Sequence, residues 1–206
     1  MKYINSAKFI SFEGGEGCGK STQCLMLRDH LVSQNIEVIL TREPGGTTQA
    51  EEIRKIILYS ELLPTTELML VMAARYEHLS KVILPALDKN IWVICDRFID
   101  STAVYQSQAV NKVDEIYTLH QQLLSNRVPD LTFIIDLPVN VALLRAKTRG
   151  ANNKFEAKGI NFHHNIRNRF LEISNMFKDR IVNINADQLS KEEIHAKVVD
   201  YLTQNN

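Results

Sequence analysis

The chain has 206 residues, which is enough for one well-buried domain and too few for two. Its 45% hydrophobic and 23% charged residues are typical of a globular protein, and its 24 basic and 24 acidic residues argue against nucleic acid as the main partner. Three cysteines are too few for a disulfide framework, and we find neither a secretory signal pattern nor an apolar run near the roughly 20 residues of a membrane span, so we expect a cytoplasmic protein without a membrane partner.

Short apolar runs alternate with longer amphipathic stretches along the chain. The sequence predicts strands at 8–13, 36–41, 91–95, 131–136 and 180–184. It predicts helices near 19–34, 47–59, 65–88, 100–108, 113–125, 138–149, 160–178 and 190–203. Strands that are apolar nearly throughout are typical of a parallel sheet covered on both faces. We therefore predict an α/β fold, a five-stranded parallel sheet flanked by helices on both faces, whose ligands bind where the strands end.

The first predicted strand is followed by GGEGCGKST, which matches the phosphate-loop pattern G-x-x-x-x-G-K-[ST]. In such a loop backbone N–H groups and a helix N-terminus hold phosphate oxygens, Lys20 reaches the β- and γ-phosphates, and the Ser21 hydroxyl ligates Mg²⁺. The loop lies between a buried strand and a helix, so we predict a P-loop nucleoside triphosphate hydrolase-like fold. The nucleotide-binding residues are predicted to be Gly14, Gly15, Glu16, Gly17, Cys18, Gly19, Lys20, Ser21 and Thr22.

A second short pattern, NKVD at 111–114, matches the guanine-reading motif of small GTPases. That motif follows a buried strand, whereas the residues before this one are polar and interrupted. The chain also lacks the Asp-x-x-Gly switch that a GTPase needs. We therefore interpret NKVD as a loop and a helix start.

Charged residues follow the second and third predicted strands. TREPGGT places Arg42 and Glu43 after the second strand, and CDR places Asp96 and Arg97 after the third. A carboxylate beside a phosphate loop is suited to support magnesium, and a guanidinium there binds phosphate in bidentate fashion. Arg75 lies within a predicted helix, where a lone arginine is usually on a solvated face.

Farther along, RAKTRG places Arg145, Lys147 and Arg149 at the end of a helix that follows the fourth strand. A polar stretch comes next, and then a helix with further arginines. Basic residues around a polar stretch are typical of a lid that folds over a triphosphate and excludes water. We predict such a mobile lid near 145–162, and a solvated basic helix is the alternative interpretation.

Together the segments FEGGEGCGKST, TREPGGT, AAR, CDRF with STAVYQ, and RAKTRG resemble the bacterial thymidylate kinases in order and spacing, over essentially the whole chain. The resemblance implies one nucleoside monophosphate kinase domain over 1–206 that works as a homodimer. It implies transfer of the γ-phosphoryl group of ATP to dTMP, with Mg²⁺, to give dTDP for dTTP biosynthesis. ATP and dTMP are then the partners of the chain.

The resemblance also implies roles for individual residues. Catalytic roles fall on Lys20, Arg97, Arg145 and Arg149. Acceptor binding falls on Glu16, Arg42, Glu43, Arg75, Arg97, Ser101, Thr102, Tyr105 and Gln106. Metal binding falls on Ser21 and Asp96. A phosphate acceptor has a second pKa near 6, so no histidine base is expected at the site.

Two places depart from the family pattern. Val71 stands where relatives often carry a Phe that stacks on thymine, so base discrimination rests on Tyr105, Gln106 and Arg75 or on another aromatic. Asn153 and Lys154 stand where relatives often have Asp and Arg. Two alternatives therefore stay open: a kinase for another nucleotide or nucleoside, and a regulatory protein that binds ATP without turnover.

Overall fold

The five strands form one parallel sheet, as the sequence predicts. The computed structural model describes residues 7–204 apart from 111, 125, 149 and 151–152. Within this part the strands are β1 (Phe9–Glu13), β2 (Val38–Arg42), β3 (Trp92–Asp96), β4 (Leu131–Asp136) and β5 (Ile181–Asn185). Their order is β2-β3-β1-β4-β5, and all neighbours are parallel. The predicted fold class is confirmed.

The helices lie where the amphipathic stretches predict them. They are α1 (Lys20–Ser33), α2 (Thr48–Tyr59), α3 (Pro64–His78), α4 (Leu84–Asp88), α5 (Ile99–Tyr105), α6 (Asp114–Leu123), α7 (Val139–Thr148), α8 (Ile160–Met176) and α9 (Lys191–Gln204). A π-helical turn, Leu79–Ile83, joins α3 to α4, where the sequence predicts a single helix at 65–88. The hydrogen-bonding pattern changes just before Pro85, because proline has no N–H to donate. Asp114 begins α6, in agreement with the interpretation of NKVD as a helix start; Asn111 lies outside the described residues.

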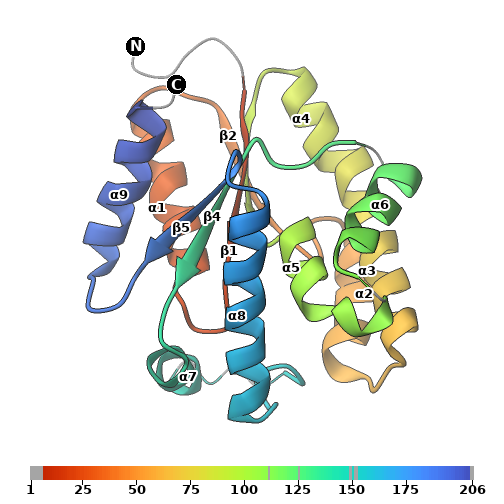
Figure 1. Cartoon of the computed structure of the whole chain (residues 1–206). Helices are drawn as coiled ribbons and strands as arrows, with labels where there is room; N and C mark the ends of the chain where they lie inside the picture. The colour runs from red at the N-terminus through yellow and green to blue at the C-terminus, as the bar shows by residue number, and fades with distance from the viewer. Residues whose placement is uncertain (1–6, 111, 125, 149, 151–152, 205–206) are drawn as a thin grey trace.

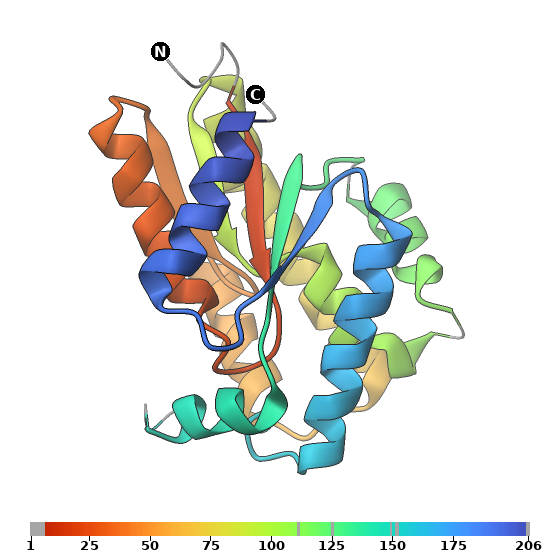
Figure 2. The same ribbon diagram turned by 60° about the vertical axis from the view of Figure 1, so that its left-hand side comes forward.

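Two apolar cores cover the two faces of the sheet. Figures 1 and 2 show α1 and α9 on one face and α3, α5 and α8 on the other. Successive strand residues point to opposite faces, so each strand supplies both cores. On the α1 side Phe12 stacks on Phe133 at 5.4 Å, and on the α5 side Phe9 meets Phe98 edge-on at 4.9 Å. Burial of each such ring stabilises the fold by about 1.5–3 kcal/mol.

The carboxyl ends of the strands meet at one end of the molecule. In Figures 1 and 2 this is the end where α7 lies, opposite the start of β1 and the end of α9. The phosphate loop follows β1 here, and the charged residues at the ends of β2 and β3 come to the same edge, because parallel strands end together. In the described part of the chain, every helix is too short or too polar to cross a membrane.

Candidate active site

The loop between β1 and α1 folds as a phosphate loop. Gly17 has a φ of 75°, and a Cβ atom there would lie 1.9 Å from the Ala142 carbonyl oxygen of α7, so only glycine fits. The Lys20 ammonium donates to the Gly15 carbonyl oxygen at 2.7 Å and lies 3.6 Å from the Cys18 sulfur. The loop thus surrounds a positive charge at the start of a helix, as anion binding requires.

Two hard oxygen ligands meet beside the loop. The Ser21 hydroxyl, on the first turn of α1, donates to the Asp96 carboxylate at the end of β3. Both side chains line a cavity of about 110 Å³ together with Lys20. Among the described residues no cluster of three or more His, Cys, Asp or Glu forms a metal cage. A hydroxyl and a carboxylate oxygen beside a phosphate cradle fit Mg²⁺, which keeps several waters and binds substrate phosphates.

Arg97 lies at the junction of the phosphate loop and the helix α5. Its φ of 72° is in the left-handed region, which is uncommon for residues other than glycine. The guanidinium donates to Gly14 O at 3.0 Å, to Glu16 Oε1 at 2.7 Å, to Ser101 Oγ at 3.0 Å and to Tyr105 Oη at 3.3 Å. Burial alone lowers the pKa of Arg97, but the nearby negative charges, Glu16 first, raise it well above its usual value. Arg97 is therefore a fixed, permanently charged donor.

The carboxyl group of Glu13 supports the backbone turn at Arg97. It accepts a hydrogen bond from the N–H of Phe98 at 2.7 Å and another from the Ser101 hydroxyl, which in turn accepts from Arg97. Glu13 is fully buried, and burial followed by the charge of Asp100 raises its pKa to about 8. The sequence analysis did not single out Glu13, although a charged residue at the end of an apolar strand indicates a buried polar role.

A cavity of about 500 Å³ opens next to Arg97. Val71 lines it, so the place of the expected aromatic is aliphatic, and aromatic side chains come instead from Tyr59, Phe98, Tyr105 and Phe155. Tyr105 packs edge-on against Phe155 at 5.5 Å, which narrows the cavity on the side of the α7–α8 segment. The other predicted acceptor residues at its wall are Glu16, Arg42, Glu43, Arg75, Arg97, Ser101, Thr102 and Gln106.

Arg75 is buried at the wall of this cavity, whereas a lone arginine on a helix usually lies on a solvated face. Only 1% of it is exposed, because α3 packs against the sheet. Its guanidinium donates to Glu43 Oε2 at 2.6 Å and to Thr102 Oγ1 at 2.7 Å, and it lies 4.7 Å from the centre of the Phe98 ring. Its third nitrogen, Nη1, lies 3.9 Å from Met72 Sδ, so Arg75 is held in place at the cavity wall with its charge compensated by Glu43.

Glu43 supports Arg75 rather than standing free in the cavity. Its second oxygen meets His78 Nδ1 at 3.0 Å, and His78 Nε2 meets the Thr41 hydroxyl at 2.6 Å. Burial alone raises the pKa of Glu43, but Arg75 and then His78 lower it below its usual value. The sequence predicts no histidine base at the site, and the structure places His78 behind the cavity wall as a partner of Glu43.

Arg54 is a site residue that the sequence analysis missed. It lies on α2, donates to the carbonyl oxygens of Glu43 at 3.4 Å and Pro44 at 2.8 Å, and lines both the large cavity and the phosphate-loop cavity. Burial, then the charge of Arg42, lowers its pKa. Arg42 itself is exposed and pairs with Glu51 at 2.9 Å. Three guanidinium groups, Arg42, Arg54 and Arg97, therefore surround the junction of the two cavities.

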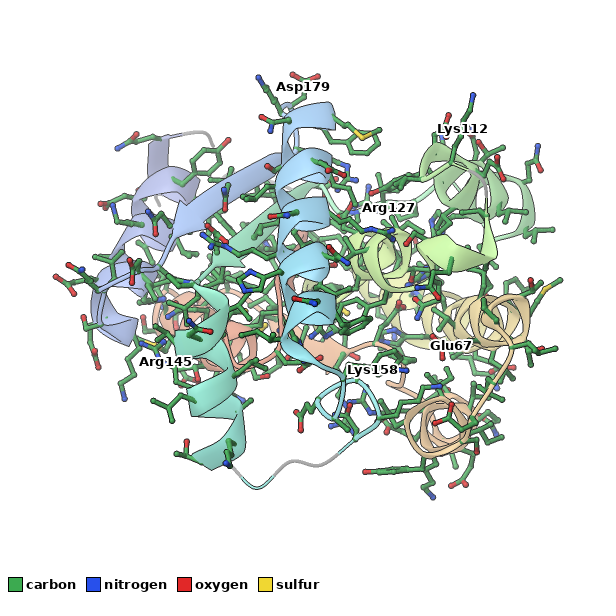
Figure 3. All side chains as sticks on the ribbon, turned by 60° about the horizontal axis from the view of Figure 1, so that its bottom comes forward. Glu67, Lys112, Arg127, Arg145, Lys158 and Asp179 are labelled. Carbon is green, nitrogen blue, oxygen red and sulfur yellow. The ribbon has the colours of Figure 1, made fainter. Side chains whose placement is uncertain are left out.

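The predicted lid residues lie on two sides of the site. Arg145 on α7 lines a cavity of about 280 Å³ with Thr22 and Ser190, while Arg149 lies outside the described residues. The segment between α7 and α8 lines the acceptor cavity through Asn153 and Phe155. In Figure 3, which looks onto this end of the molecule, the segment labelled at Lys158 lies between Arg145 on α7 and Glu67 on α3.

Comparisons with known proteins agree with this geometry. A model of the thymidylate kinase family matches residues 12–198. Thymidylate kinases of Rickettsia africae and Rickettsia bellii (strain RML369-C) are 49% and 48% identical to the chain over 203 residues, which is 98% of the chain and 100% and 98% of those proteins. A crystal structure of thymidylate kinase from Ehrlichia chaffeensis superimposes with a TM-score of 0.78 at 33% identity, covering 96% of this chain and 99% of that one.

Proposed function

The chain belongs to the thymidylate kinase family, and we propose that it transfers the γ-phosphoryl group of ATP to dTMP with the residues described above. One observation carries the proposal: the phosphate loop and a nucleotide-sized cavity share Arg97 and Glu16. An acceptor phosphate at their junction lies beside the place of the γ-phosphate. A protein that only binds ATP has no need of this second cavity.

The acceptor is proposed to lie with its phosphate at Arg42, Arg54 and Arg97 and its base near Arg75. The first three arginines surround the phosphate-loop cavity, and Arg75 lies deeper, against Phe98 and Thr102. Ser101, Thr102, Tyr105 and Gln106 line the space between them. A guanidinium suits both a phosphate and a carbonyl edge of a base.

ATP is proposed to lie across the phosphate loop toward Arg145. The loop from Gly14 to Gly19 and the N-terminus of α1 hold its phosphates, Lys20 reaches the transferring group, and Ser21 with Asp96 holds Mg²⁺. Mg²⁺ supplies charge neutralisation for the phosphate oxygens when it is bound. The cavity beside Arg145 and Thr22 receives the rest of the donor, and residues 145–162 act as the mobile lid.

Catalysis in this site is positioning and charge stabilisation. The acceptor phosphate has a second pKa near 6 and is mostly ionised at neutral pH, so no protein group has to remove its proton. Lys20, Arg97 and the lid arginines Arg145 and Arg149 stabilise the charge that spreads over the transferring phosphoryl oxygens.

A homodimer is proposed to form through α3. Met69 and Tyr76 are seven residues apart on this helix and are 63% and 52% exposed, and Leu63 just before it is 75% exposed. Large apolar side chains that gather on one face of a soluble protein mark an interaction surface. We expect the protein to work in the cytoplasm, where its free buried cysteines Cys18, Cys24 and Cys95 stay reduced.

A coupled assay with ATP, Mg²⁺ and a panel of nucleoside monophosphates and nucleosides tests the activity. We expect the highest kcat/KM with dTMP. A different best acceptor would show a kinase of another specificity, and ATP binding without turnover of any acceptor would show a regulatory protein.

A further inference from the structure

Glu67, on the first turn of α3, joins two parts of the acceptor site. Its side chain is 13% exposed. One carboxylate oxygen, Oε1, accepts a hydrogen bond from the amide nitrogen of Gln106 at 2.8 Å. The other, Oε2, accepts from the ammonium of Lys154 in the α7–α8 segment at 2.5 Å. Glu67 itself is absent from the wall of the cavity, so it acts on a ligand through its partners.

These contacts fix which way the Gln106 amide points. A carboxylate paired with an ammonium only accepts hydrogen bonds, so the nitrogen end of the amide must face Glu67. Gln106 is 6% exposed and lines the acceptor cavity. Among the described residues no donor reaches its carbonyl oxygen, which is therefore the atom left to a ligand.

We infer that Glu67 is a positioning residue for base specificity: it holds Gln106 so that the amide oxygen accepts the ring N3–H of thymine or uracil. This inference rests on the proposed function, since it requires the base of dTMP in this cavity. Thymine presents an N–H donor between two carbonyl oxygens. The oxygen of Gln106 suits the donor, and Arg75, which can only donate, suits a carbonyl oxygen.

Cytosine presents the opposite pattern along the same edge. Its ring N3 is an acceptor and would face the Gln106 oxygen, and its amino group would face the donors of Arg75. Both contacts are repulsive, and a site built around hydrogen bonds rejects such an analogue strongly because its buried polar groups stay unpaired. A reversed Gln106 amide would relieve the first of the two contacts, so Glu67 controls the discrimination.

Lys154 supplies the matched control. Its ammonium also donates to the Ser60 carbonyl oxygen at 3.1 Å, and its backbone N–H donates to the Leu58 carbonyl oxygen at 3.3 Å. It therefore anchors the α7–α8 segment to the end of α2 and to the α2–α3 connection. Lys154→Met removes a partner of Glu67 but leaves the contact between Glu67 and Gln106 in place.

The test compares dTMP with dCMP in the Glu67→Gln variant. A neutral amide at position 67 can donate as well as accept a hydrogen bond, so the side-chain amide of Gln106 can flip its oxygen and nitrogen. We expect KM for dTMP to rise about tenfold with kcat within about threefold of wild type. By titration calorimetry, the ratio of the dCMP to the dTMP dissociation constant should fall at least tenfold. In Lys154→Met both dissociation constants should shift by the same factor.

A second variant keeps the test independent of one substitution. Glu67→Asp retains the negative charge for Lys154 but withdraws the carboxylate from Gln106 by one methylene, and its dCMP to dTMP ratio should also fall. An unchanged ratio in either variant, at a wild-type melting temperature, overturns the inference. A wild-type enzyme without dTMP turnover would instead contradict the proposed function, and it is assayed first.

Discussion

Arg97 Nη2 donates to Glu16 Oε1 at 2.7 Å, and this contact joins the end of β3 to the middle of the phosphate loop. The two side chains are 15% and 19% exposed, so the pair is largely shielded from solvent. It places one guanidinium between the triphosphate cradle and the acceptor cavity before either substrate arrives. A charge held in place in this way needs little reorganisation during phosphoryl transfer.

Arg97→Ala should lower kcat by about two or more orders of magnitude, because removal of a preorganised charge costs several kcal/mol of transition-state stabilisation. ATP affinity should change little, since the loop from Gly14 to Ser21 remains. Arg28→Ala is the matched control, because Arg28 lies on α1, lines neither of the two cavities and pairs with the exposed Asp29. Steady-state kinetics and ATP titration measure both, and near-normal turnover in the Arg97 variant would remove its catalytic role.

Arg54→Ala should raise KM for dTMP at least tenfold, because a charge-assisted contact to phosphate contributes about 1.5–3 kcal/mol. Thymidine, which has no phosphate, provides the control ligand. Its dissociation constant should stay within about twofold of wild type in the variant. An equal loss of affinity for dTMP and for thymidine would show that Arg54 supports the fold of the cavity and makes no contact with phosphate.

Glu13→Gln should flatten the dependence of unfolding free energy on pH. Burial and Asp100 raise the pKa of Glu13 to about 8, so the folded protein holds a proton on it that the unfolded chain releases near its ordinary value of 4.5. The stability from this group is fully present below pH 4.5 and is lost as pH rises through about 8.

Between these two pKa values the folded protein binds one proton more than the unfolded chain, and the unfolding free energy falls by about 1.4 kcal/mol per pH unit. Urea unfolding between pH 5 and 8 measures the slope for the wild type and for Glu13→Gln. Glu172→Gln, at an exposed position of α8, is the control for removing one carboxyl group from the surface. Identical slopes in the wild type and Glu13→Gln would contradict a raised pKa at Glu13.

Met69→Asp should give a monomer in sedimentation analysis at micromolar concentration, because it puts a charge in the middle of the proposed dimer face on α3. Met176→Asp is the control: Met176 is 55% exposed but lies at the end of α8. We expect a wild-type dimer in that variant. A dimer that persists in Met69→Asp would place the interface elsewhere.

The sequence was sufficient to predict the sheet, the phosphate loop and the family. The five strands are short apolar runs, and the glycines from Gly14 to Gly19 followed by Lys20 form a local sequence pattern that is recognisable without knowledge of the fold. The charged residues after β2 and β3 were also predictable as site residues, because parallel strands end at one edge. These features depend on neighbours in the chain.

The supporting contacts were decided only by the tertiary structure. Arg75 resembles a solvated helix residue in the sequence, yet α3 packs it against Glu43 and Phe98, more than 20 positions away on either side. The links from Glu13 to Phe98 and from Glu67 to Gln106 and Lys154 likewise join distant segments. No periodicity or motif records such pairs, because a buried charge is stable only where folding brings its partner, and that depends on how the helices pack on the sheet.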